Sequence, residues 1–146
     1  MIGENVFEHC TNLKSVYIPA SVESIKEGLF GSCYNLTSVV VATNNEFYDS
    51  RDSSNAIIDS DTDELLVACS STQIPPSVKS IGDFAFYHCN TMEQLVIPEG
   101  VERIGSFAFF GCSSLKEICL PKSLTELGTD VFQGCNSLVS INIPEN

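Results

Sequence analysis

The sequence predicts a solenoid of stacked coils, mostly β with short helical turns, and two observations support this fold class. Five segments start with an apolar residue that glycine usually follows, at Ile2, Ile25, Ile81, Ile104 and Leu127. Neighbouring starts lie 23 residues apart, except that 56 residues separate Ile25 from Ile81. The same order of apolar residues follows each start, and a fixed period of about 20–50 residues is typical of a solenoid. We therefore expect about six coils of 23 residues, with the third enlarged to about 33.

Each apolar position recurs from coil to coil and should form a ladder along the stack. The first two ladders consist of one residue type each: Phe7, Phe30, Phe86, Phe109 and Phe132, then Cys10, Cys33, Cys89, Cys112 and Cys135. Pairs such as Val16/Ile18 and Ile118/Leu120 then alternate with outward residues, which predicts a strand with one buried face. Proline follows most of these strands and ends them, because it cannot donate to the next ladder.

The rest of the coil is predicted to be a bent extended segment and a compact helical turn. Apolar pairs at a spacing of three, such as Val101/Ile104, face inward after the proline. The pattern Gly-x-x-Ala/Val-Phe-x-x-Cys that follows is too short for more than a turn or two of helix.

The segment IGSFAFFGCSSLKEICLP, residues 104–121, resembles the BspA-like, or Treponema-type, leucine-rich repeat. IGDFAFYHCNTMEQLVIP (81–98) and IGENVFEHCTNLKSVYIP (2–19) carry the same pattern, so the resemblance covers nearly the whole chain. It implies a leucine-rich-repeat solenoid. Coil two departs from the pattern, with Lys26 in place of glycine and Ala42 in place of proline.

Residues 42–75 interrupt the pattern and rejoin it in phase at Ile74-Pro75. The apolar runs NAII (55–58) and LLVA (65–68) flank the polar DSDTDE, which predicts a β-hairpin that projects from an irregular coil at about 48–80. Asp59, Asp61 and Asp63 are spaced like the start of a calcium loop, but Glu64 stands where that loop needs glycine. A solvated turn and a weak cation site both remain open, with the turn favoured.

Composition excludes some classes of function. Nineteen acidic against seven basic residues give a net charge of −12, which should repel nucleic acid and anionic membranes. No apolar run approaches the roughly 20 residues that span a bilayer, so we expect no direct membrane insertion. We predict one domain over residues 1–146, a segment of a longer array whose uncapped ends could also associate end to end.

The seven cysteines allow a disulfide framework, a zinc site or buried structural thiols. Five share one repeat position, which favours small buried residues, and no CxxC pair supports zinc. Cys119 should point outward, as a reactive or an incidental surface thiol. His9 and His88 each precede a ladder cysteine, but they lie about three coils apart and no orienting third residue is evident, so we expect neither an enzyme nor a cofactor.

A parallel sheet built from one strand per coil presents its outward residues as an extended surface for a protein ligand. The predicted contact residues are Ser15, Tyr17, Ser38, Val40, Ser71, Gln73, Gln94, Val96, Glu117, Cys119, Ser140 and Asn142. We expect a non-enzymatic binding module, and the resemblance implies an adhesin at the surface of a bacterium or secreted from it, binding a host extracellular or bacterial surface protein. The alternative is a structural spacer without a ligand of its own.

Overall fold

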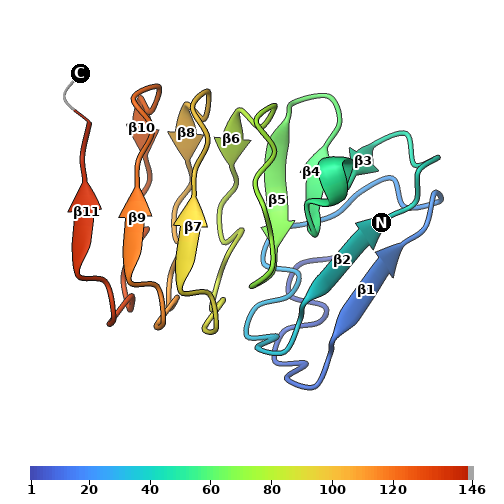
Figure 1. Ribbon diagram of the computed structural model, residues 1–146. Helices are drawn as coiled ribbons and strands as arrows, with labels where there is room; N and C mark the ends of the chain where they lie inside the picture. The colour runs from blue at the N-terminus through green and yellow to red at the C-terminus, as the bar shows by residue number, and fades with distance from the viewer. Residues whose placement is uncertain (145–146) are drawn as a thin grey trace.

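The computed structural model describes residues 1–144, which form a solenoid in which successive coils lie side by side (Figure 1). Coils one and two begin at Ile2 and Ile25, coil three is the irregular one, and coils four to six begin at Ile81, Ile104 and Leu127. The longer strand of each regular coil faces one side: β1(Ser15–Ile18), β2(Ser38–Val41), β7(Gln94–Val96), β9(Glu117–Cys119) and β11(Ser140–Asn142). We call these the front strands.

The front strands pair in parallel in the register that the 23-residue period predicts. Tyr17 pairs with Val40, and Gln94 pairs with Glu117, which pairs with Ser140. However, β1–β2 and β7–β9–β11 are two separate sheets, because residues 71–74 of coil three form no strand between them. The front surface is therefore interrupted in the middle.

A third sheet forms another side of the solenoid, in the order β10-β8-β6-β5-β4-β3. It contains the ends of the predicted bent segments at Ile81, Ile104 and Leu127 as two-residue strands, and the irregular coil supplies its other strands. Its members are β3(Tyr48–Asp49), β4(Ala56–Asp59), β5(Glu64–Ala68), β6(Ser80–Ile81), β8(Arg103–Ile104) and β10(Glu126–Leu127).

The hairpin β4–β5 exists, but the prediction that it projects is wrong. Strand β5 pairs in parallel with β6, so the hairpin lies within the side of the solenoid. It separates two hydrophobic clusters: Ile57 and Val67, which are paired across the hairpin, pack with coils one and two, whereas Ile58 and Leu65 pack with coils four to six. Because both faces of the hairpin are buried, its strands are continuously apolar instead of alternating.

Stacked phenylalanines fill the core on each side of this partition. The rings of Phe86 and Phe109 are 4.9 Å apart between centroids, and Phe109 and Phe132 are 5.6 Å apart, all nearly parallel. Phe7 and Phe30 form a separate stack at 5.4 Å. The predicted phenylalanine ladder is thus present on both sides of coil three.

The compact segments after each coil start are turns and not the short helices we expected. Within residues 1–144 the only helical element is the 3-10 segment η1(Arg51–Ser53). The reason lies in the backbone, since each turn has two positions of positive φ, which a helix cannot accept. In coil four these are Phe84 (58°) and His88 (58°), and in coil five Phe107 (57°) and Gly111 (71°).

Candidate functional site

The predicted front-strand residues are largely exposed, and the three largest apolar ones stand out. The exposed fractions are 65% for Tyr17, 43% for Val40 and 80% for Val96. Tyr17 and Val40 are paired neighbours on β1 and β2, so they form one apolar patch. Val96 lies beside Cys119 on β7 and β9, next to a shallow hollow of about 170 Å³ that also includes Gln94 and Glu117.

Two of the predicted contact residues are exposed but also make hydrogen bonds within the chain. Ser71 donates a hydrogen bond to the carbonyl of Thr37 and, like the exposed Gln73, lies outside any strand. The side-chain amide of Asn142 bonds both backbone groups of Leu120, at 2.8 Å from the N–H and 3.3 Å to the carbonyl. The remaining candidates, Ser15, Ser38 and Ser140, belong to front strands as predicted.

The cysteine ladder is structural, as the repeat pattern indicates, apart from its first member. Cys33, Cys112 and Cys135 each donate from Sγ to the carbonyl of a phenylalanine in the preceding coil, at 3.0–3.2 Å. Burial raises the pKa of the Cys89 thiol. Cys10 is exposed, contrary to its predicted burial, because no other coil covers it within residues 1–144. Cys119 is exposed as predicted.

The two histidines have a conformational explanation. His9 and His88 occupy the second positive-φ position of their turns, at 61° and 58°, where Gly111 and Gly134 stand in coils five and six. The His88 ring packs edge-on against Tyr87 and Phe110 at centroid distances of 4.5 and 5.6 Å. These contacts place the His88 ring within a group of aromatic side chains on the turn side of the solenoid.

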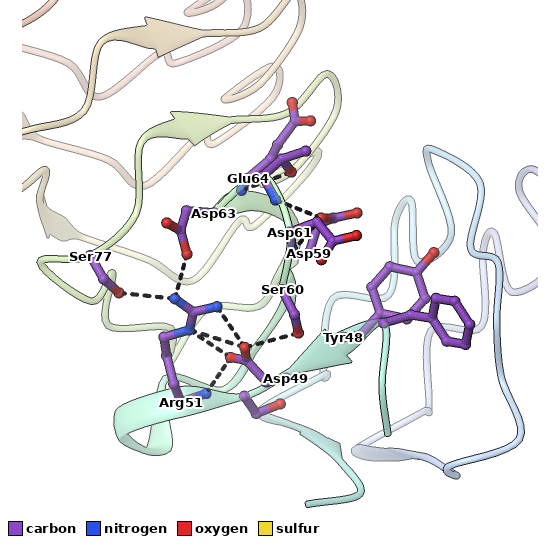
Figure 2. Close-up of polar contacts among 12 residues, drawn as sticks. Tyr48, Asp49, Arg51, Asp59, Ser60, Asp61, Asp63, Glu64 and Ser77 are labelled. Carbon is purple, nitrogen blue, oxygen red and sulfur yellow. Dashed lines mark hydrogen bonds and ion pairs between the residues drawn. The ribbon is translucent and has the colours of Figure 1, made fainter. Parts of the chain in front are cut away.

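The aspartates of the hairpin turn do not converge on a cation site. Asp59 accepts hydrogen bonds from the backbone N–H groups of Asp61 and Thr62, which closes the turn. Asp63 instead turns toward Arg51 (Figure 2). Within residues 1–144, no group of three or more His, Cys, Asp or Glu side chains is arranged to hold a metal ion.

Arg51 is the centre of a polar network that fastens the irregular coil (Figure 2). Its guanidinium binds the Asp49 carboxylate through two nitrogens, at 2.6 Å for the shortest contact, and pairs with Asp63 at 2.5 Å. The same group reaches Ser77 of the following segment at 3.3 Å. Burial acts to raise the pKa of Asp49, but the hydrogen bonds and charge of Arg51 outweigh it and the net shift is downward.

A groove that was not predicted from the sequence lies on the side of the solenoid that carries the compact turns. Phe84 and Tyr87 form one wall of a hollow of about 310 Å³, and Glu4, Glu8 and Glu27 also line it. The repeated pairs Phe84/Tyr87 and Phe107/Phe110 were a visible signal for aromatic rings on this side. The equivalent positions of coils one, two and six hold other residues.

The stacked coils, the parallel front strands and the apolar ladders define the class of protein as a leucine-rich-repeat solenoid. The chain belongs to the BspA type leucine rich repeat family, whose pattern matches residues 1–56 and 58–146 in six copies. Described residues include no helix that is long and apolar enough to cross a membrane.

Solved bacterial structures share this architecture. The chain is 28% identical to a leucine-rich repeat protein from Eubacterium ventriosum, with a TM-score of 0.78 over 88% of this chain and 36% of that one. A leucine-rich repeat protein from Bacteroides ovatus is 32% identical, with a TM-score of 0.58 over 95% of this chain and 33% of its own length. The pneumococcal vaccine antigen PcpA shares the fold at 24% identity and a TM-score of 0.69, over 92% of this chain and 40% of PcpA. The chain thus spans less than half of each of these proteins, and a comparison with curated proteins gave no match.

Proposed function

We propose that the chain is a non-enzymatic protein-binding module of a bacterial surface or secreted protein and that it serves in adhesion. The surface location and the adhesive role rest on the family resemblance. The binding role rests on the fold, because repeat solenoids offer extended surfaces to partner proteins.

One observation carries the proposal. Tyr17 and Val40 are adjacent, exposed and held on paired strands, so their side chains are presented at little conformational cost. Tyrosine is one of the residue types enriched among the few interface residues that dominate binding energy. Val96, exposed at 80% on β7, extends the apolar contact area beyond the interruption.

A specific observation favours the spacer as a second candidate. The side chains of Ser71 and Asn142 form hydrogen bonds with the backbone of the chain itself, and the front strands β2 and β7 are not paired with each other. A spacer requires only that the coils stack and stay soluble, and the strong negative charge supports solubility.

The experiment compares capture of surface and extracellular proteins by three immobilised forms of the chain. The wild type should retain a partner that the Tyr17→Ser/Val40→Ser variant loses, with at least a tenfold drop in affinity once the partner is purified. Phe47→Ser is the matched control, since Phe47 is an exposed aromatic residue outside the front strands. Equal capture by all three forms would favour the spacer.

A further inference from the structure

The compact turns of neighbouring coils are joined by backbone hydrogen bonds, and this ladder is broken once. In coils four and five, Phe86 donates to Ala108 at 2.8 Å and His88 donates to Phe110 at 2.8 Å. In coils one and two, Phe7 donates to Leu29 at 3.2 Å. Over residues 1–144, no such bond joins the turn of coil two to the turn of coil four, because coil three contributes the hairpin β4–β5 in place of a turn.

The groove described above lies at this break, which explains its origin. Gly28 of coil two lines it on one side of the break, and its aromatic wall comes from Phe84 and Tyr87 of coil four. We call it the turn-side groove. At about 310 Å³ it falls in the size range of small-ligand and side-chain pockets.

The aromatic wall is held in place by further rings. Phe84 stacks on Phe107 at a centroid distance of 5.1 Å with an interplanar angle of 8°, and Tyr87 stacks on Phe110 at 5.2 Å and 16°. Phe84 and Tyr87 also meet edge to face at 5.5 Å. Rings fixed in this way present their faces and edges without a loss of rotamer entropy on binding.

The charged groups at the groove are of one sign. Glu4, Glu8 and Glu27 line it, and no lysine or arginine does. Within the described residues, Glu4 and Glu27 have no ion-pair partner, and Glu8 faces only His9 at 3.6 Å. Lys26 lines the adjoining hollow of about 260 Å³, and Arg103 beyond it is already paired with Glu64 and Asp83 at 3.3 and 3.1 Å.

We propose that the turn-side groove is a docking site for a lysine or arginine side chain on a basic segment of a partner protein. The methylene stem would lie along Phe84 and Tyr87 and the cationic head would face the glutamates. This combines hydrophobic contact, cation–π attraction and ion pairing in one place. The groove is on a different side of the solenoid from the front strands, so the proposal goes beyond the function proposed above.

The test is a titration with a fluorescent hexalysine peptide, blocked at both ends, at low and at physiological salt. The double variant Glu4→Gln/Glu27→Gln should weaken binding more than fivefold. The control Glu46→Gln/Glu102→Gln removes the same number of charges from exposed sites outside the groove and should change binding less than twofold. Equal weakening by both would mean that only net charge matters and would overturn the proposal.

The aromatic wall has its own arm of the test. Tyr87→Leu keeps an apolar side chain but removes the ring face, and it should weaken binding about threefold to fivefold. Thermal unfolding of each variant verifies that the fold is kept. Unchanged binding by Tyr87→Leu, or no measurable binding by the wild type at low salt, would refute the proposal. The Tyr17→Ser/Val40→Ser variant should bind the peptide normally, so failure of the front-strand proposal would be seen separately.

Discussion

Gly111→Ala offers the most detailed prediction about how the coils stack. Gly111 has a φ of 71°, and a Cβ atom there would lie 2.3 Å from Nδ1 and 2.5 Å from Cε1 of His88. The substitution therefore forces a non-glycine residue into a left-handed conformation and displaces the His88 ring from Tyr87 and Phe110. The first effect costs about 1–2 kcal/mol, and the lost ring contacts add about 1 kcal/mol.

We expect Gly111→Ala to lower the free energy of unfolding by about 2–3 kcal/mol, and the Tm by roughly 4–12 °C for a domain of this size. Urea and thermal unfolding measure these values. Because the ring causes the clash, His88→Ala should remove about 1 kcal/mol of the penalty in the double variant, as a double-mutant cycle would reveal. A loss below about 0.5 kcal/mol, or strictly additive effects of the two substitutions, would refute this account of the turn.

Three further predictions test other parts of the structure. Gly128→Ala places a Cβ 2.4 Å from the backbone nitrogen of Ser106 and should lower the free energy of unfolding by about 2–3 kcal/mol. The control Gly3→Ala meets only a Val6 methyl at 3.6 Å and should change that free energy by less than about 0.5 kcal/mol. Equal effects of the two substitutions in urea unfolding would argue against the close approach of coils five and six. Arg51→Met should lower the free energy of unfolding by about 1–2 kcal/mol at pH 7. The lowered pKa of Asp49 in the folded state gives stability that is lost as the pH falls through that pKa, so the variant should lose less stability than the wild type on acidification below about pH 4. Parallel curves of stability against pH would contradict the Asp49–Arg51 pair. A maleimide should modify Cys10 and Cys119 in the native protein well before the buried thiols, as mass spectrometry of the labelled peptides can measure; early labelling of Cys112 would be inconsistent with the ladder.

The repeat made most of the fold predictable. Phe86, Phe109 and Phe132 recur at one phase, and a residue that recurs at every coil has the same neighbours in every coil, so the stacks and the front-strand register followed from the period alone. The position of Cys119 between Ile118 and Leu120 was sufficient to predict its exposure.

The features that the repeat did not predict lie where the repeat is interrupted or where its residues vary. The hairpin was predicted from its turn, but its position was not, because local pattern does not specify which distant strand will pair with β5. The runs around Ile57 and Leu65 did carry a clue, since strands apolar at every position are usually buried on both faces. The hydrogen bonds that Ser71 and Asn142 make within the chain were not predicted, because they depend on neighbouring residues rather than on alternation along the strand.

The turn-side groove and the division of the core depend on one structural claim, that the irregular coil is built into the side of the solenoid. Amide hydrogen exchange at Ala68 and Gly82 tests it most directly, because the N–H of Ala68 donates to the carbonyl of Ala85 in coil four and the N–H of Gly82 donates to the carbonyl of Leu65 in β5, two bonds that a projecting hairpin would lack. The account predicts that these amides exchange as slowly as those of Ile81 and Ile104 in the neighbouring strands. Exchange at the rate of an exposed loop would show that the hairpin projects after all and would contradict the account.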